Sequence, residues 1–463
     1  MSLRQRVTQI ATIHTISDDS DQPTPGSASS PRAESRRGHA IRLNRVLGRI
    51  VPLILLVYIS YTYDLVVIRY AFRHLYIQQR RVLFPILWLL PTHGLFLFSL
   101  RTYLRVFLAH SNVLNSQKGN GGALSWLCRS LGATFLEPSQ AQLEEELSIH
   151  RALSSLAPAH ARVSIHLCQP NGELFRCFRD SCNGRMKAFR TRHCGDCGVC
   201  RVGFDHHCAW FDNDVTAPAT LSSFVGFLLS IPPLYTLGLG PLFPTAWRTL
   251  KRISNFAKSD LEIRSRWWNK WYSWVGGPAF RWILGFGLGT KKWSDMTKAE
   301  RLPHESVRAP ILVALGAVFV FVAIGLAASS LTNLKSGRLT IDVERSKAYW
   351  KLEQQMEKLQ KTTSGRDHER SAALQRKMDS LAPAQHFRVT WKDNRSGEEK
   401  EKIVVLSIQE GLLSHGTPWV NIQRFLGSGN PSGSAPRPAW SLSDSALRKV
   451  LQKASIMLPD LDH

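Results

Sequence analysis

The stretch HCGDCGVCRVGFDHHCAWFDND, residues 193–214, places four cysteines and three histidines within 22 residues. Zinc sites in proteins are four-coordinate and favour Cys and His at short sequence spacings. The stretch begins H-C-x2-C-x2-C and ends on an aspartate, and a C-x4-C pair, Cys177 and Cys182, lies upstream. These are more ligands than one zinc ion needs and about enough for two. The pattern therefore predicts a short domain in which metal replaces a hydrophobic core.

The distribution of cysteines supports metal binding over disulfides. Seven of the eight cysteines lie between residues 168 and 208, and Cys128 is the exception. The N-terminal residues have no apolar core followed by small residues, so we expect no cleaved signal peptide. Without a sign of export, closely spaced cysteines indicate metal ligands.

One thiol is left over if two zinc ions divide these ligands. The two sets of four would be Cys177, Cys182, His193 and Cys200, and Cys194, Cys197, His207 and Asp214. Cys208 would then be free, with His206 and Asp205 two and three positions before it. A histidine that takes the thiol proton and a carboxylate that orients the histidine form the layout of an activated nucleophile.

Apolar residues gather in four long runs outside this segment. The runs are residues 50–68, 82–100, 221–247 and 309–334. A helix that spans a bilayer needs about 20 apolar residues, so each run is long enough. Four buried helices of a large soluble protein are the alternative, but such helices are usually shorter and interrupted by charge. We therefore predict four transmembrane helices.

Four spans place both termini and the cysteine-rich segment on one side of the membrane. An arginine-rich N-terminal tail indicates that this side is the cytosol; its arginines are Arg32, Arg36, Arg37, Arg42, Arg45 and Arg49. The loop 248–308 is also basic and would face the lumen, where charge bias carries little weight in so long a loop. A fifth crossing at 277–289 is the alternative, and it would move the C-terminus to the other side.

The predicted fold class is an α-helical membrane protein with four transmembrane helices and a small zinc-bound cysteine-rich cytosolic domain between spans two and three. Six regions follow: 1–45, a disordered basic tail; 46–109, transmembrane helices one and two; 110–166, a cytosolic linker; 167–219, the cysteine-rich zinc domain; 220–335, helices three and four with the lumenal loop 248–308; and 336–463, a cytosolic C-terminal region. In the last region, 343–360 has helical periodicity and 398–408 is typical of a strand.

The sequence DHHCAW, residues 205–210, preceded by the H-C-x2-C-x2-C array and placed between spans two and three, resembles the DHHC family of integral-membrane protein S-acyltransferases. In that family, two structural zinc ions brace the site. The motif cysteine takes a fatty acyl group from acyl-CoA and passes it to a cysteine of a substrate protein. The resemblance implies palmitoyl-CoA as donor, Cys208 as nucleophile, His206 as general base and Asp205 as its orienting partner.

The resemblance also assigns roles around the motif. It implies that His207 is a zinc ligand. Lys187 and Arg190 fall where the family keeps basic residues, which suits contacts with the CoA phosphates.

The sequence departs from the family pattern at several places. C-x4-C stands where C-x2-C is usual, which leaves Cys168 as an alternative ligand, and Ala209 replaces a proline. Asp214 stands where the family has its last zinc-ligating cysteine; a carboxylate can bind zinc at about 2.0–2.2 Å, or it can be a solvated group. LTID (339–342) loosely fits a Thr-Thr-x-Glu element, and GTPWVNIQRFLG (416–427) resembles the family's asparagine-containing C-terminal element.

The sequence thus predicts a protein S-palmitoyltransferase, a multi-pass protein of the ER or Golgi whose catalytic segment faces the cytosol. Its expected partners are the bilayer, palmitoyl-CoA and cytosolic-face substrate proteins with cysteines. One alternative is a catalytically inactive zinc-braced scaffold of the same fold, which the altered ligand and threonine element would favour. A nucleic-acid-binding zinc protein would suit the net charge of +24, but the four apolar runs argue against it, so no nucleic acid is expected.

Overall fold

The computed structural model describes residues 50–109, 149, 153, 163–299, 307–362, 368–392, 396–427 and 439–456. The predicted disordered tail, residues 1–45, lies outside them, as does most of the predicted linker. The chain divides into two compact units. Unit 1 comprises residues 1–52, 100–227 and 325–463, and unit 2 comprises residues 53–99 and 228–324.

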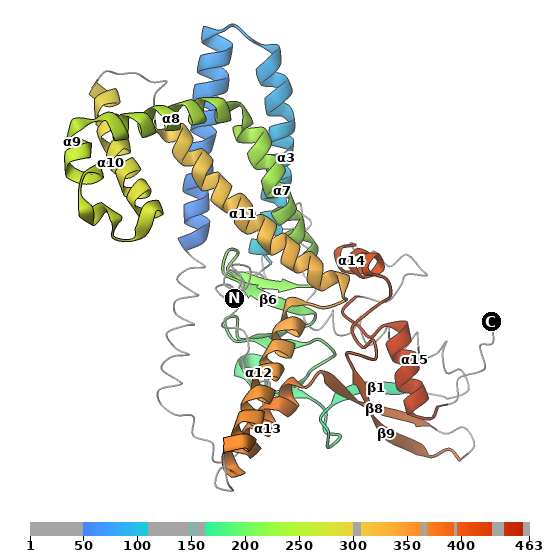
Figure 1. Cartoon of the computed structure of the whole chain (residues 1–463). Coiled ribbons are helices and arrows are strands. Elements are labelled where there is room, and N and C mark those ends of the chain that lie inside the picture. Colours follow the sequence, from blue (N-terminus) through green and yellow to red (C-terminus); the bar gives the residue numbers. More distant parts are fainter. Residues whose placement is uncertain are drawn as a thin grey trace. The chain divides into compact units, whose positions relative to one another are not determined.

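Four helices in the described part of the chain are long and apolar enough to cross a membrane: Ile50–Gln78, Leu83–Phe107, Leu221–Ser259 and Arg308–Lys335 (Figure 1). The elements within them are η1 (Asp64–Gln78), α3 (Leu83–Phe107), α7 (Leu221–Leu239), η3 (Gly240–Leu242), α8 (Phe243–Ser259) and α11 (Arg308–Lys335). Each of the four contains one of the predicted apolar runs. The prediction of four membrane-spanning helices is confirmed.

The helices of unit 2 contact one another through aromatic side chains that are buried or half-buried. The indole of Trp88 on α3 donates to the Leu237 carbonyl at 2.6 Å, and the Tyr235 hydroxyl donates to the Val313 carbonyl at 2.9 Å. Large apolar side chains point outward instead of inward, and Leu90 on α3 is 72% exposed. A surface of this kind suits contact with lipid, because contiguous apolar surface is unfavourable in water.

The loop that was predicted to be lumenal is largely helical. After α8 come α9 (Leu261–Ile263), η4 (Arg264–Trp268), η5 (Trp271–Trp274) and α10 (Gly277–Ala299). Figure 1 shows α10 folding back beside α8, and the two pack together. α10 covers the residues of the alternative fifth crossing, but among the described helices it is not one of the four that are long and apolar enough to span.

The cysteine-rich segment of unit 1 consists of three small antiparallel hairpins and one helical turn. The hairpins are β2–β3 (Arg176–Cys177, Arg185–Met186), β4–β5 (Arg192–Cys194, Val199–Arg201) and β6–β7 (Phe204–Cys208, Asn213–Thr216), and the turn is η2 (Asp180–Cys182). Gly198 closes β4–β5 with a φ of 70°, which a glycine adopts without strain. Strands of two to five residues cannot bury a core of their own, so other forces must hold them.

A second part of unit 1 has an ordinary hydrophobic core. It is a three-stranded antiparallel sheet in the order β1-β8-β9, with β1 (Ser164–Cys168), β8 (Ala384–Lys392) and β9 (Glu399–Ser407). Alternate residues of β8, Phe387 and Val389, are buried against Leu447 and Leu451 of α15 (Asp444–Lys453). β9 matches the predicted strand 398–408. The pairing of β8 with β1, more than 200 residues earlier in the chain, was not predicted.

The described part of unit 1 also contains three further helices: α12 (Thr340–Thr362), α13 (His368–Leu381) and α14 (Pro418–Leu426). A buried arginine connects these C-terminal segments with the cysteine-rich segment. The Arg190 guanidinium donates to the carbonyls of Gly337, Leu413 and Ala439, and it lies 3.5 Å from the Asp342 carboxylate. Because its side chain is only 2% exposed, these contacts replace water almost completely.

The segment that resembles the family's C-terminal element forms α14 and packs against the end of α11. The Asn421 amide donates to the carbonyl of Lys335, the last residue of α11, at 3.0 Å, and its oxygen accepts from the His415 N–H at 2.8 Å. The Phe425 ring lies 5.4 Å from the guanidinium carbon of Arg190. Asn421 therefore attaches the C-terminal region to the last membrane helix.

Replacing Arg190 by alanine should destabilise unit 1. The substitution leaves Asp342 buried without its ion pair, and the loss of one partner of a buried pair typically destabilises by about 3–5 kcal/mol. The control is Arg388→Ala. Arg388 lies on β8, is 37% exposed and pairs with Glu401 on β9, so its loss should change stability by about 0–1 kcal/mol. Thermal unfolding of the purified protein in detergent measures both effects. Equal melting temperatures for Arg190→Ala and wild type would contradict the role of Arg190 in connecting the C-terminal segments with the cysteine-rich segment.

Candidate metal centres and active site

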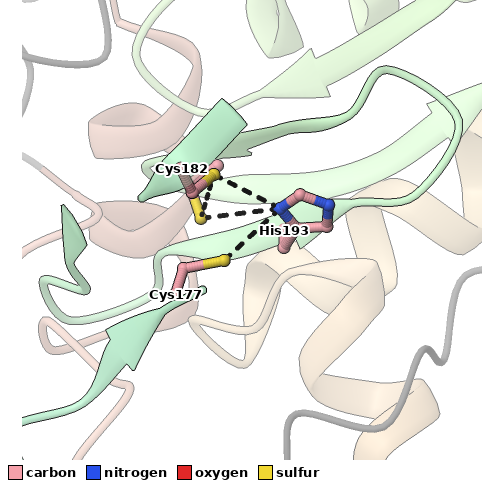
Figure 2. A group of neighbouring side chains, drawn as sticks. Cys177, Cys182 and His193 are labelled. Carbon is pink, nitrogen blue, oxygen red and sulfur yellow. Dashed lines mark hydrogen bonds between the residues drawn. The ribbon is translucent and has the colours of Figure 1, made fainter. Parts of the chain in front are cut away.

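The first candidate metal centre gathers Cys177, Cys182, His193 and Cys200, all buried. The His193 Nδ1 lies 3.5 Å from the sulfurs of Cys177 and Cys182 and 3.9 Å from that of Cys200. Figure 2 shows the labelled cysteines turned toward the His193 ring. The structure brings Cys182 and not Cys168 into this group, because η2 takes up the extra residues of the C-x4-C pair.

Asp180 holds the far side of the His193 ring. Its Oδ2 lies 2.9 Å from His193 Nε2, while Nδ1 faces the sulfurs. A carboxylate in this position fixes the tautomer and the orientation of a metal-binding imidazole. Sequence reasoning missed Asp180, although its place inside the C-x4-C insertion was a usable signal.

The second candidate metal centre gathers Cys194, Cys197, His207 and Asp214. The His207 Nδ1 lies 3.7 Å and 3.5 Å from the sulfurs of Cys194 and Cys197, and 3.0 Å from Asp214 Oδ1. The β6–β7 register places His207 directly opposite Asp214. Asp214 is only 3% exposed, so it is not a solvated carboxylate.

Arg201 determines how Asp214 presents its two oxygens. The Arg201 Nε donates to Oδ2 at 3.1 Å, which leaves Oδ1 directed at His207. Burial opposes ionisation of Asp214, but the hydrogen bond and charge of His207 and the charge of Arg201 lower its pKa to about 2. Asp214 therefore stays an anionic oxygen donor at neutral pH.

The buried sulfurs need a cation to be anionic. A hydrogen bond with Cys197 that holds the thiol proton, together with burial, raises the pKa of Cys194 well above its ordinary value. Metal binding is coupled to deprotonation of such ligands, so the site exchanges protons for a cation. Each of the two clusters could bind one metal ion.

Two adjacent histidines on β6 point to different places. Successive side chains of a strand project to opposite faces, so His206 and Cys208 share one face and His207 takes the other. His206 hydrogen-bonds with Cys208, whereas His207 joins the second cluster. Among the described residues, Cys208 belongs to neither candidate metal centre.

A β-bulge places Asp205 beside its neighbour His206. The β6–β7 register shifts between Phe204 and His206, and a bulge of this kind redirects a side chain. Asp205 Oδ2 lies 2.7 Å from His206 Nδ1. The N–H and the hydroxyl of Thr340, the first residue of α12, donate to Asp205 at 2.6 Å and 3.0 Å. Asp205 is thus held from one side and holds His206 on the other.

The proton resides on His206 at neutral pH. Burial opposes the imidazolium form, but hydrogen bonds with Asp205 and Cys208 outweigh burial and raise the pKa of His206 to about 10. A cysteine beside an imidazole that a carboxylate orients is the layout of an activated nucleophile.

The hairpin that carries Cys208 is docked on the end of α3. The Tyr103 hydroxyl donates to the Trp210 carbonyl at 3.2 Å, and the Asn213 amide donates to the Val106 carbonyl at 2.6 Å. Phe211 is fully buried, with its ring 4.9 Å from that of Tyr103. Cys208 therefore lies next to the end of a helix that is suited to cross a membrane.

Lys187 and Arg190 stay predictions as CoA contacts. Both side chains are buried in the described structure. The Arg190 guanidinium is directed at backbone carbonyls, so a contact with a phosphate would require it to be uncovered.

The DHHC palmitoyltransferase family matches residues 173–343, which include both clusters, Cys208 and Thr340. The chain contains a DHHC palmitoyltransferase domain. Palmitoyltransferase spe-10 of Caenorhabditis elegans is 33% identical over 72 residues, which are 16% of this chain and 20% of that protein. The chain thus matches about a fifth of the length of this curated relative.

Removing the Asp214 carboxylate should empty the second candidate metal centre alone. We expect purified Asp214→Ala protein to hold one metal ion per chain instead of two, because the remaining three ligands leave a position open. Asp214→Cys should keep both ions, and so should the control Asp212→Asn, whose residue lies outside both clusters. Elemental analysis of the protein measures the stoichiometry; two ions bound to Asp214→Ala would rule out this ligand set.

The protonated His206 should contribute to stability in a defined pH range. Its pKa is raised from 6.5 to about 10 in the folded protein, so its contribution is complete below pH 6.5 and is lost as the pH rises through about 10. The melting temperature of wild type minus that of His206→Gln should therefore shrink with rising pH. A difference that is constant between pH 6 and pH 10 would show that the ring is neutral.

Proposed function

We propose that this protein is a protein S-palmitoyltransferase that uses Cys208 as its acyl carrier. Cys208 would take the palmitoyl group from palmitoyl-CoA as a thioester and pass it to a cysteine of a substrate protein. The observation that carries the proposal is the arrangement of Asp205, His206 and Cys208, in which the sulfur lies outside both metal clusters and contacts a protonated histidine.

In the first step, His206 holds the thiol proton and the Cys208 sulfur attacks the thioester carbonyl of the donor. The bond to the CoA sulfur breaks, and CoA leaves as a thiol once it takes a proton. In the second step, the thiolate of a substrate cysteine attacks the new thioester, and the Cys208 sulfur leaves. One thioester is exchanged for another in each step, so acceleration comes from positioning and thiolate activation. Asp205, held by Thr340, keeps the His206 ring in place.

We further propose that both clusters hold zinc. With Zn–S bonds of about 2.3 Å and Zn–N bonds of about 2.0–2.1 Å, the edges of a tetrahedral site are about 3.6 Å for sulfur to nitrogen and about 3.8 Å for sulfur to sulfur. The first cluster has sulfur–nitrogen distances of 3.5–3.9 Å and a Cys182–Cys200 distance of 3.6 Å. Zinc would brace the hairpins there, which lack a core of their own.

The place of Cys208 supports catalysis at a membrane surface. A palmitoyl chain stays in lipid because each buried CH₂ is worth about 0.8 kcal/mol. A sulfur beside the end of α3 can reach a thioester whose acyl chain lies in the bilayer. We infer that the site is at the boundary of membrane and cytosol, in the ER or Golgi, with cytosolic-face proteins as substrates.

The alternative of an inactive scaffold loses its two motivations. It rested on Asp214 and on the altered threonine element at 339–342. Asp214 lies among the ligands of the second cluster, and Thr340 contacts Asp205 through both its N–H and its hydroxyl. Neither departure from the family pattern removes a part of the proposed site.

Incubation of purified protein with labelled palmitoyl-CoA tests the proposal. Wild type should acquire a hydroxylamine-sensitive label, and Cys208→Ser should acquire none while its metal content is unchanged. His206→Gln should slow labelling by about 10²–10⁴-fold, the usual contribution of a general base. The control is Cys168→Ser, which removes a buried cysteine outside both clusters and should label normally. Full labelling of Cys208→Ser would sink the assignment.

A further inference from the structure

The helix α10 has its packing faces reversed relative to a helix of a water-soluble protein. Two glycines, Gly285 and Gly289, are its buried positions, whereas the large aliphatic residues Ile283, Leu284 and Leu288 are exposed. In water, the large apolar residues would turn inward and the small or polar residues outward. The side chains of α10 follow the arrangement typical of helices that pack in lipid.

The glycines serve a close approach to the preceding segment. A Cβ at Gly285 would overlap the Trp268 ring, and a Cβ at Gly289 would overlap Ala257 of α8. The spacing of four residues between the glycines matches the small-xxx-small pattern by which membrane helices pack. Helix contact is thus made by small residues, and the aliphatic side chains are left for another environment.

Polar and aromatic contacts within the segment connect α10 with the residues before it. Lys292 on α10 contacts Asp260 at 2.8 Å and Glu262 at 2.9 Å. The Arg281 guanidinium lies 4.1 Å from the centre of the Trp274 ring, and the Trp268 indole donates to the Ala257 carbonyl at 2.7 Å. The orientation of α10, and with it the outward direction of its apolar side chains, is therefore fixed by several contacts.

The same segment is rich in exposed tryptophan and in cations. Residues 243–299 hold seven of the 14 tryptophans of the chain, and eleven lysines and arginines against three carboxylates. Trp271 is 79% exposed, and Trp247 and Trp274 are exposed as well. The outward side of α8 carries basic side chains: Arg248, Lys251, Arg252 and Lys258. Tryptophan and basic residues together are typical of segments at the bilayer–water interface.

We propose that the α8–α10 segment lies on a leaflet of the bilayer as an interfacial anchor. The aliphatic face of α10 and the indoles of Trp271 and Trp274 would enter the boundary of headgroups and acyl chains. The cations of α8 would meet anionic phospholipid headgroups. Contact with lipid follows from connectivity, because α8 continues the membrane helix Leu221–Ser259 and only residues 300–307 separate α10 from α11.

The length of the apolar part argues for lying on the membrane instead of crossing it. Residues 277–290 of α10 precede two adjacent lysines, Lys291 and Lys292. At 1.5 Å per residue, this stretch is about 21 Å long, and the hydrocarbon core is about 30 Å thick. Attached between two membrane helices, an anchor of this kind would fix the depth of α7 and α11 in the bilayer.

Tryptophan quenching by brominated phospholipids tests the anchor in the full-length protein. The protein is reconstituted into nanodiscs of phosphatidylcholine and phosphatidylserine, with bromine either near the glycerol end of the acyl chains or near the bilayer centre. We expect the Trp271→Phe/Trp274→Phe variant to show less quenching by the shallow bromines than wild type. It should also lose the blue-shifted part of the emission that the two indoles contribute. The matched control is Trp350→Phe, which removes a 61%-exposed indole on α12 and should leave shallow quenching unchanged.

A second variant tests the apolar face itself. Ile283→Asp/Leu288→Asp changes exposed side chains and does not alter the glycines that contact Trp268 and Ala257, so it should reduce shallow quenching in the same way. Equal quenching of the Trp271→Phe/Trp274→Phe variant and wild type would overturn the proposal and leave the face to a protein partner. Stronger quenching by the central bromines would also overturn it, because the segment would then enter the membrane core.

Discussion

The chemistry of this protein depends on the direction in which two adjacent histidines point. Because β6 is a strand, His206 and His207 project to opposite faces, and one dipeptide serves two different sites. His207 reaches the second metal cluster, and His206 reaches Cys208. In a helix, adjacent side chains are only about 100° apart around the axis, so the two rings could not point in opposite directions. The bulge at Asp205 then adds the carboxylate that the alternation alone would have turned away.

The two candidate metal clusters would brace the short strands around them. Hairpins of two to five residues are too short to enclose a core of their own, so ligands to a metal ion would help to set their geometry. The second cluster contains Asp214 where a cysteine would offer one sulfur. Arg201 donates to one carboxylate oxygen, so only the other oxygen is directed into the cluster. The altered ligand therefore changes the donor atom but keeps the charge and place of a ligand.

The Asp205 carboxylate of the candidate active site is also tied to the distant C-terminal region. Thr340 binds Asp205, and two residues further on Asp342 meets Arg190, whose guanidinium reaches the chain again near residues 413 and 439. A basic residue near a cysteine cluster looks in sequence like a phosphate ligand, since its partners lie 150 to 250 residues away. No local pattern distinguishes an exposed arginine from one enclosed by carbonyl groups.

The sequence by itself determined the four membrane helices and the grouping of cysteines, histidines and Asp214, because both are written in local composition and spacing. It also singled out Cys208, because this cysteine lies outside the two ligand sets and follows Asp205 and His206. Tertiary structure alone decided the roles of Asp180, Arg190 and Arg201, the pairing of β1 with β8, and the reversed faces of α10. The physical reason is that hydrogen bonds, burial and helix contacts join residues far apart in the chain, and only the folded backbone brings them within reach.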